Sequence, residues 1–339
     1  MPTLMKAELE SLTANIFRHA GAPDDLAQQV AQVLVDNHLA GHDSHGILRI
    51  PEYLRSIADG EIVPTARPEV IEETPVSALV QGHWALGQAT GLFAADLAIA
   101  KAKAHHLAVV SVVQAAHTGR LAAFTERAAR QDVVMFMAIG TVDRPMTAPF
   151  GGAAAVLGTN PVAFSLPNPD GPPITLDIAT SAIAAGKVKV AKARHEKLPP
   201  DVILNRHGQA TVEPQDFLDG GFLLPFGGHK GYALAVIAEL LSGPLIGAES
   251  YPAVTQRSGI FMFAMDAGLF RAKPDYARAL ANRLGQIKGV PPAAGFTEVL
   301  VPGEPEARTR AEREKNGIPI PEDTWSAVQA AALSVGCAI

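Results

Sequence analysis

The stretch GHDSHG, at residues 41–46, places four chemically capable side chains between two glycines. They could bind a metal, form a hydrolase nucleophile site or move a proton, and they could also make an ordinary polar turn. A nucleophile elbow needs G-x-S-x-G after a strand, whereas Gly41 stands three residues before Ser44 and follows a helical pattern. His42 and His45 could share a helical face as metal ligands, but no third ligand is spaced to help them. A metal-dependent hydrolase or lyase stays open as an alternative.

A second polar stretch, AAHTGRL at residues 115–121, follows the apolar run LAVVSVVQ, which is typical of a buried strand. In open α/β sheets, ligands gather beyond the carboxyl ends of the strands. His117, Thr118, Gly119 and Arg120 offer there a proton-transfer group, a hydroxyl, backbone amides and a fixed cation. An ordinary loop with a hydrogen-bonded histidine is the alternative.

A third stretch, residues 148–161, is studded with glycines that permit close backbone approach to a ligand, and Thr159 and Asn160 add polar contacts. In residues 176–187, Asp177 ends an apolar strand, and Thr180 and Ser181 are expected to cap the helix that follows. Such a helix start suits an anion, while Asp177 could instead orient a histidine.

The stretch PFGGHKGYALAVIAELLSG, at residues 225–243, puts His229 and Lys230 at the start of another helix, which again indicates an anion site. Three common motifs are missing. The 30 glycines never occur as G-x-G, so the Rossmann fingerprint is absent. No P-loop sequence occurs, and HEKLP at residues 195–199 lacks the second histidine of a zinc protease.

The elements that must position these residues follow from apolar periodicity. Helical spacing predicts helices in the first 60 residues, which are closed by Gly21 and Gly60. Further helices are predicted at 91–106, 181–191, 230–242, 274–286, 302–317 and 321–336, the last packing through Trp325, Val328 and Leu333. Strands are predicted at 76–82, 107–114, 132–140, 161–167, 173–179 and 259–266. Alternating strands and helices predict an α/β fold with helices covering a sheet.

We expect three parts: residues 1–72 as a helical N-terminal part carrying GHDSHG, 73–300 as a central α/β body that binds cofactor and substrate, and 301–339 as a C-terminal helical tail that packs with the N-terminal part. The chain has 339 residues, of which 48% are apolar, and this is ample for a large core. A net charge of −6 and the lack of basic tracts argue against nucleic-acid binding.

The apolar runs are too short to cross a membrane, the first residues lack the apolar core of a signal peptide, and the single cysteine, Cys337, cannot form an internal disulfide. A cytoplasmic protein without a membrane partner is therefore expected.

Six ordered stretches together resemble one family. They are GHDSHGILRIPEYLRSI, AAHTGRLAAFTERAA, APFGG…GTNPVAFSLP, LDIATSAIAAGK, GGHKGYALAVIAELLSG and VPGEPEARTRAEREKNGIPI. They are similar to the type-2 malate/L-lactate dehydrogenase family, and most of all to its hydroxycarboxylate dehydrogenases. The resemblance implies a non-Rossmann site for NAD or NADP, with NAD favoured, and a homodimer that acts on a small 2-hydroxy or 2-oxo acid.

The resemblance also implies roles for residues. In imine-reducing members, the positions of Ser44, His45 and Asp177 form a proton relay, while in others the position of His117 supplies the base. Arg49 is expected to bind the substrate carboxylate. The further substrate-binding candidates are Tyr53, Thr118, Gly119 and Arg120. The cofactor-binding candidates are Thr159, Asn160, Asp177, Ile178, Ala179, Thr180, His229, Lys230, Gly303 and Glu304. No metal is expected, and reduction of cyclic imino acids is the alternative activity within the family.

Overall fold

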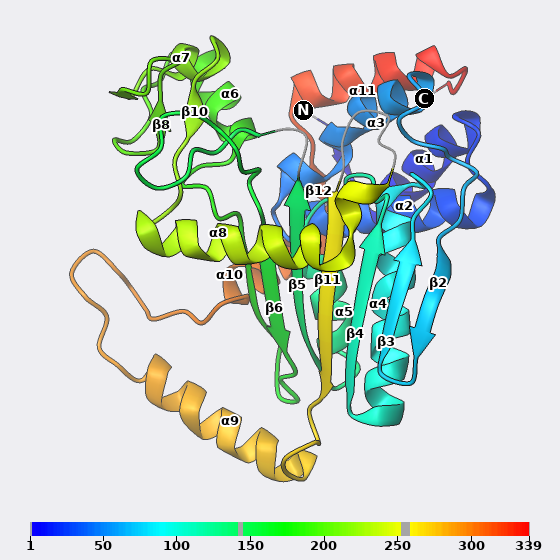
Figure 1. The fold of residues 1–339 in the computed structure, drawn as a ribbon, viewed down its shortest axis with the longest axis vertical. Helices are drawn as coiled ribbons and strands as arrows, with labels where there is room; N and C mark the ends of the chain where they lie inside the picture. Colours follow the sequence, from blue (N-terminus) through cyan, green and yellow to red (C-terminus); the bar gives the residue numbers. More distant parts are fainter. Residues whose placement is uncertain (1, 142–144, 252–257, 339) are drawn as a thin grey trace.

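The computed structural model of the chain describes residues 2–141, 145–251 and 258–338, and Figure 1 shows their course. The α-helices are α1 (Lys6–His19), α2 (Asp24–Leu39), α3 (Ile50–Ala58), α4 (Gly87–His105), α5 (Ala122–Ala129), α6 (Ala185–Ala193), α7 (Pro214–Leu218), α8 (His229–Ser242), α9 (Lys273–Lys288), α10 (Glu304–Asn316) and α11 (Glu322–Ser334). Short 3₁₀ turns are η1 (Asp43–His45), η2 (Ile47–Arg49), η3 (Pro244–Ile246) and η4 (Ala248–Ser250).

The strands are β1 (Thr3–Leu4), β2 (Glu69–Thr74), β3 (Ser77–Gln81), β4 (Leu107–Val113), β5 (Val133–Thr141), β6 (Val162–Leu166), β7 (Ile174–Ile178), β8 (Ile203–Leu204), β9 (Ala210–Thr211), β10 (Phe222–Leu223), β11 (Ser258–Asp266) and β12 (Ile318–Pro319). No helix among the described residues combines the length and the apolar character that a membrane span requires.

The N-terminal helices α1, α2 and α3 pack on one apolar core that the end of the chain completes. Leu9, Ile16 and Leu34 are fully buried in it, and Val328 and Ala332 of α11 join the same cluster. The short strands β1 and β12 pair antiparallel, so the two ends of the chain lie together. This core is what holds the GHDSHG segment, because that segment directly follows α2 and leads into α3.

The three packing positions expected in the last helix behave differently. Val328 is fully buried and Trp325 packs, partly buried, against the same cluster, whereas Leu333 is 67% exposed. Successive residues of an α-helix differ by about 100° in direction, so Leu333 points away from the core that Ala332 enters. The expectation for Leu333 is wrong.

The central sheet has seven strands in the order β2-β3-β4-β11-β5-β6-β7. The α/β class is confirmed, but the pairing within this sheet is mainly antiparallel: β3 and β4 are parallel, and the other neighbours are antiparallel. The cause is β11, which returns from late in the chain and inserts between β4 and β5. Helices α4 and α5 cover one face, and α8 lies across the other (Figure 1).

A smaller lobe holds α6, α7 and a sheet of β10, β8 and β9, around its own cluster of apolar residues. The helix predicted over 181–191 begins only at Ala185. Ser181 instead forms a β-bridge with Pro225, and the backbone N–H of Ala182 bonds to the carbonyl of Leu224. Because residues 180–182 pair with residues 224–226 in this way, Thr180 and Ser181 do not cap the helix, and that expectation is wrong.

Candidate active site

GHDSHG forms a tight link between α2 and α3, and part of its polar content is structural. Nδ1 of His38, at the end of α2, lies 3.0 Å from Oδ1 of Asp43, and Arg313 of α10 donates to the same oxygen at 2.5 Å. Although burial opposes it, these two hydrogen bonds lower the pKa of Asp43 to about 2. A Cβ on Gly46 would stand 2.1 Å from the His38 ring, so only glycine fits there. Asp43 therefore serves to hold the segment.

His45 leaves this segment with its side chain tied to its neighbour. Its Nδ1 lies 3.1 Å from the hydroxyl oxygen of Ser44, and its carbonyl accepts a hydrogen bond from Asn37 at 2.9 Å. Burial, and then the nearby charges of His117 and Arg49, lower the pKa of His45 to about 3. The imidazole is therefore neutral at physiological pH.

His117 comes from the loop after β4 and stacks on His45. The two ring centroids are 6.0 Å apart with 18° between the planes. Nδ1 of His117 lies 2.7 Å from the hydroxyl of Tyr53, a buried residue of α3. His117 is exposed to solvent on one side. Desolvation by the protein atoms packed around it, and then the positive charge of Arg49, lower its pKa to about 3. Two neutral histidines thus face each other across the link between the helical part and the sheet.

Arg49 supplies the positive charge beside this pair. Its Nε donates to the Ser44 carbonyl at 2.8 Å, and one terminal nitrogen lies 2.6 Å from Glu52. Thr118 is 1% exposed, and its hydroxyl has no hydrogen-bond partner among the described residues. Gly119 has φ +91°, and a Cβ there would stand 3.3 Å from the Asn37 amide. The expected residues Ser44, His45, Arg49, Tyr53 and His117 are therefore brought together.

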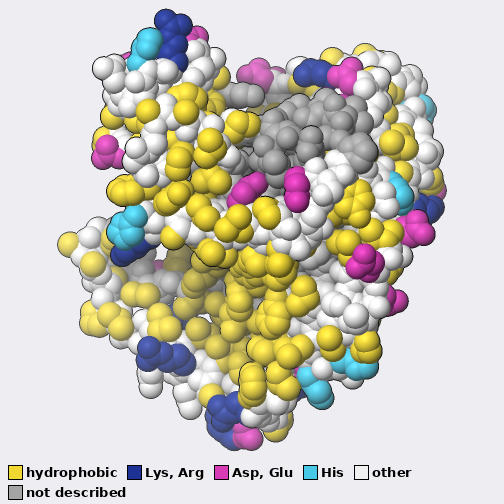
Figure 2. Space-filling model, viewed as in Figure 1, with side chains coloured by type: hydrophobic (Ala, Val, Ile, Leu, Met, Phe, Trp, Pro, Cys, Tyr) yellow, Lys and Arg dark blue, Asp and Glu magenta, His cyan; other side chains and the backbone are white. Residues whose placement is uncertain are grey.

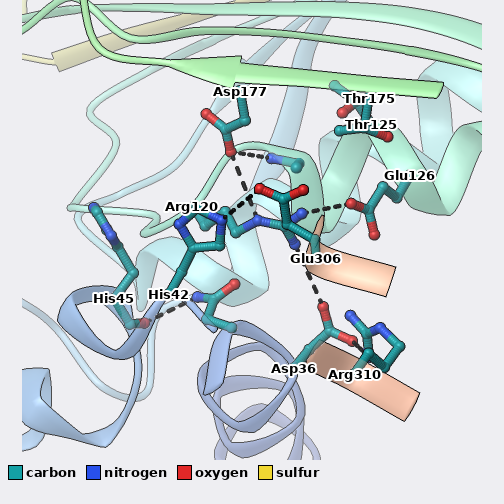
Figure 3. Close-up of polar contacts among 12 residues, drawn as sticks. Asp36, His42, His45, Arg120, Thr125, Glu126, Thr175, Asp177, Glu306 and Arg310 are labelled. Carbon is teal, nitrogen blue, oxygen red and sulfur yellow. Dashed lines mark hydrogen bonds and ion pairs between the residues drawn. The ribbon is translucent and has the colours of Figure 1, made fainter. Parts of the chain in front are cut away.

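Asp177 and Arg120 form a separate buried charge cluster, shown in Figure 3. Oδ2 of Asp177 accepts the Ala122 N–H at 2.7 Å and lies 4.0 Å from Nε of Arg120. Arg120 is 3% exposed, bonds to Glu126 at 2.5 Å and lies 3.9 Å from Asp36. Burial raises the pKa of Asp177 to about 6, against the opposing effect of the Ala122 hydrogen bond and Arg120.

The relay of Ser44, His45 and Asp177 is thus assembled only in its first half. Within the ranges that the structure describes, the hydrogen bond of the Asp177 carboxylate goes to the Ala122 N–H, and its charge partner is Arg120. His45 makes its side-chain contact with Ser44 instead. His45 and Asp177 are therefore not hydrogen-bonded to each other.

Most of the residues expected to bind cofactor lie along α8 and the residues that lead into it. The N–H and the hydroxyl of Thr180 both donate to the Thr159 carbonyl at 2.9 Å, and Phe226 N–H donates to the Thr180 carbonyl. Asn160 is fully buried and donates to Glu239 of α8. Exposed His229 and Lys230 open α8.

Gly303 and Glu304 stand at the start of α10, away from the other cofactor candidates and near the start of β7. A Cβ on Gly303 would stand 2.9 Å from the Pro173 carbonyl oxygen and 3.2 Å from the Thr175 nitrogen, two residues before Asp177. The Glu304 carboxylate accepts the N–H of Val301 and pairs with Lys288. These two residues therefore meet the start of β7, whereas the other candidates gather at its end.

The residues around α8 fit a nicotinamide cofactor. Oδ1 of Asn160 is buried without a hydrogen-bond partner among the described residues, so an acceptor is present for a ligand donor. The start of a 14-residue helix, with His229 and Lys230 exposed there, is suited to phosphate groups.

Several polar partners of the site residues carry no signal in the sequence. Gln88 of α4 donates to the Tyr53 hydroxyl at 3.0 Å, and Arg310 of α10 pairs with Asp36 at 2.7 Å. His42 contacts Glu306 of α10 at 3.3 Å. These partners lie 35 or more residues apart in the chain, so only the tertiary fold brings them together. Among the described residues, no three His, Cys, Asp or Glu side chains are grouped to hold a metal ion.

Comparison with known proteins identifies the family. The family model of malate/L-lactate dehydrogenase matches residues 4–329. L-sulfolactate dehydrogenase of Methanocaldococcus jannaschii is 34% identical, over 98% of this chain and 97% of that protein. Its solved structure superposes with a TM-score of 0.90 at 33% identity, over 99% of this chain and 98% of the other.

Two further relatives extend the match. Hydroxycarboxylate dehydrogenase B of Escherichia coli strain K12 is 34% identical, over 97% of this chain and 93% of that protein. The structure of Δ1-piperideine-2-carboxylate reductase from Pseudomonas syringae has a TM-score of 0.88 at 30% identity, over 98% of this chain and all of the other. Family membership implies a nicotinamide cofactor. The chain therefore belongs to the malate/L-lactate dehydrogenase family and is a dehydrogenase of the type-2 malate/L-lactate class, as the sequence motifs predicted.

Proposed function

We propose that this dehydrogenase interconverts 2-hydroxy acids and 2-oxo acids, with NAD favoured over NADP. The observation that carries the proposal is the stacked pair His45 and His117 beside Arg49. When bound, the nicotinamide supplies or accepts the hydride. Each remaining requirement of the reaction, an acid/base group and a cation for the carboxylate, is met by a residue at this site.

Arg49 is the proposed carboxylate-binding residue, in preference to Arg120. The guanidinium of Arg49 is part-exposed, with 26% of its side chain accessible, and its charge already acts on both histidines. Arg120 is 3% exposed, and its guanidinium lies among the carboxylates of Glu126, Asp36 and Asp177. Because a buried guanidinium among carboxylates has little attraction left for another anion, Arg120 is assigned to holding Asp177 and Glu126.

His45 and His117 are the proposed acid/base pair. In oxidation, one imidazole accepts the hydroxyl proton of the substrate. In reduction, it returns that proton to the oxygen. Both rings are neutral near pH 7, so one of them can take up a proton, and the stacked arrangement disfavours a second positive charge. Asp177, held by Arg120, is proposed to tune the local field rather than to touch His45.

The cofactor is proposed to run along the start of α8. Lys230 and His229 would meet its phosphates, while Thr159, Asn160 and residues 177–180 line the approach. Gly303 and Glu304 would support β7 from its other end.

Reduction of cyclic imino acids is the second candidate, favoured by the similarity to the Δ1-piperideine-2-carboxylate reductase structure. The test is oxidation of NADH and NADPH by the purified protein with pyruvate, oxaloacetate, phenylpyruvate, hydroxyphenylpyruvate and piperideine-2-carboxylate. The proposal expects turnover with a 2-oxo acid. Turnover with the imine alone would move the assignment to the second candidate.

We also propose a homodimer. Below α8, the uncovered face of the sheet is apolar (Figure 2), with half-buried Phe136, Phe164, Phe261 and Phe263 and with Leu176 40% exposed. On α8 itself, Ile237 and Leu240 are 54% and 48% exposed. Exposed apolar patches of this kind mark protein interfaces. The cytoplasmic location stays a prediction, which cell fractionation would test.

A further inference from the structure

The contact between Tyr53 and His117 leaves open which atom carries the hydrogen. The Tyr53 hydroxyl lies 2.7 Å from Nδ1 of His117, and each of these atoms can donate or accept. If the hydroxyl donates, neutral His117 carries its own proton on Nε2. If Nδ1 donates, Nε2 is a free lone pair. The two forms have opposite chemistry, because the first offers an N–H to a substrate oxygen and the second offers a base.

Gln88 of α4 decides between the two forms. This residue is 1% exposed, and one end of its amide lies 3.0 Å from the Tyr53 oxygen, 3.3 Å from the His117 carbonyl and 3.4 Å from the Thr118 carbonyl. Carbonyl oxygens only accept hydrogen bonds, so this end of the amide is its NH₂ group. Gln88 therefore donates to the Tyr53 oxygen.

With that donor in place, the single hydrogen of the Tyr53 hydroxyl points at His117. Tyr53 is 2% exposed, and Gln88 and His117 are the hydrogen-bond partners of its hydroxyl among the described residues. If Nδ1 of His117 also donated to Tyr53, the tyrosine hydrogen would be buried without an acceptor. Leaving a buried donor unpaired costs roughly 1–3 kcal/mol. The favoured form has the hydrogen of Tyr53 on Nδ1.

His45 is under no such constraint. Its Nδ1 contacts the hydroxyl of Ser44, which is exposed and can rotate to donate or to accept. His45 can therefore lose or gain a proton at Nε2 while its other nitrogen keeps a partner. The same change at His117 would break the chain that runs from Gln88 through Tyr53.

We propose that Gln88 is a positioning residue which, through Tyr53, keeps the proton of His117 on Nε2, so that His117 donates a hydrogen bond to the substrate oxygen while His45 transfers the proton. This inference rests on the proposed function. In oxidation, the O–H bond of the substrate breaks and its proton goes to Nε2 of neutral His45. The electron pair of that bond forms the C=O π bond as the hydrogen on C2 leaves with its own electron pair as hydride, while the His117 N–H bonds to the oxygen throughout.

The groups that face His117 are the Tyr53 hydroxyl, the His45 ring and the guanidinium of Arg49, which acts on it through its charge. None of these is a carboxylate that would favour a proton on Nδ1. The resting form is therefore set by the neutral hydrogen-bond chain.

The test reads the ring directly. In protein labelled with ¹⁵N-histidine, long-range ¹H–¹⁵N NMR at pH 7 reports which ring nitrogen is protonated, and His117→Asn assigns the signals. The wild type is expected to show His117 protonated on Nε2. In Tyr53→Phe, the proton should redistribute between the two nitrogens. A wild-type His117 protonated on Nδ1 would overturn the inference, and no variant needs to fold for that result.

Kinetics with two variants separate positioning from bulk structure. Gln88→Glu replaces the donor by a carboxylate, which accepts the Tyr53 hydrogen and frees the tyrosine oxygen to accept from Nδ1. We expect the Nδ1–H form in NMR and a fall of kcat by about 10-fold or more, as loss of an oriented donor gives, with a smaller change in KM.

The matched control is Gln81→Glu, at a glutamine that is hydrogen-bonded to Gln114, and it should retain both tautomer and kcat. A Gln88→Glu enzyme with unchanged tautomer and unchanged kcat would contradict the role of Gln88. The proposed function is tested separately. If His117 is protonated on Nε2 but the protein turns over neither oxo acids nor imines, the proposed activity is contradicted and the hydrogen-bond chain from Gln88 is not.

Discussion

Arg49 is the positive charge that acts on both His45 and His117. Arg49→Ala should raise KM for the 2-oxo acid by about 10-fold to 100-fold, because a charge-assisted hydrogen bond contributes roughly 1.5–3 kcal/mol. The effect on kcat should be smaller, since the carboxylate is bound in the ground state as well as in the transition state. Steady-state kinetics measure both constants.

The control for this substitution is Glu52→Gln, which removes the ion-pair partner of Arg49 and keeps the guanidinium. It should leave KM within a few-fold of the wild type. If Arg49→Ala and Glu52→Gln had the same KM as the wild type, Arg49 would not bind the substrate carboxylate.

Asp177 makes stability depend on pH. Burial raises its pKa from 3.8 to about 6, so between these values the folded state holds more protons than the unfolded chain. Stability should therefore fall as pH rises from about 4 to about 6, by at most about 3 kcal/mol for a shift of about two units. Asp177→Asn keeps an acceptor for the Ala122 N–H and removes the titration.

Denaturant unfolding at pH 4, 5, 6 and 7 should show a smaller decline for Asp177→Asn than for the wild type. Equal declines in the two proteins would mean that the Asp177 carboxylate has the same pKa in the folded and the unfolded state.

Asp177→Asn also tests directly whether the charge of Asp177 is needed for turnover.

At the scale of elements, α4 fixes the loop that carries His117. A Cβ on Gly87, the first residue of α4, would stand 2.3 Å from the His117 carbonyl oxygen and 2.5 Å from that of Ala116. Gly87→Ala must push this loop away, and a displacement near 1 Å at a reacting group can cost about 100-fold in rate. We expect kcat to fall to that extent, measured with the favoured substrate.

Gly285→Ala is the matched control, because it lies inside helix α9 with open space around the added methyl group. It should keep kcat and gain roughly 0.5–1 kcal/mol of helix stability. Normal turnover in Gly87→Ala would show that the position of α4 does not matter to His117.

Long periodic elements could be predicted from the sequence, and short or polar ones could not. The helix of residues 91–106 and the strand of residues 259–266 correspond closely to α4 and β11, because each buries a continuous apolar face. By contrast, β2 is mostly exposed, with the sequence EVIEET, and it forms only because it pairs with β3. A strand held by its neighbour leaves no periodic signal in its own residues.

The site follows the same division. The motifs singled out His45 and His117 as proton-transfer candidates from their own segments, and the family resemblance added Tyr53. The partners that set their chemistry, Gln88 and Asp36, come from remote helices and were not predicted. The expected contact of His45 with Asp177 is not made, because Arg120 and the Ala122 N–H take that carboxylate.

At the scale of the whole molecule, the uncovered apolar face of the sheet beside α8 needs a partner to be explained. Light scattering should give a mass of twice 35.5 kDa. Ile237→Asp, on the exposed side of α8, should shift this mass toward the monomer, since a buried unpaired carboxylate costs several kcal/mol.

Leu333→Asp serves as the control, because Leu333 is equally apolar and 67% exposed on α11 in the other part of the molecule. It should leave the dimer intact. A wild-type protein that is monomeric at micromolar concentration would contradict the proposed dimer, and the apolar face would then need another occupant.

The central claim is that a hydride passes directly between a nicotinamide and C2 of a 2-oxo acid bound at His45, His117 and Arg49. The most direct measurement is mass spectrometry of the hydroxy acid made with nicotinamide cofactor deuterated at the transferred position of C4. The account predicts one deuterium at C2 of the product, and His45→Gln should make only a trace of this labelled product. Product formed without deuterium, or no hydroxy acid from any oxo acid tested, would contradict it.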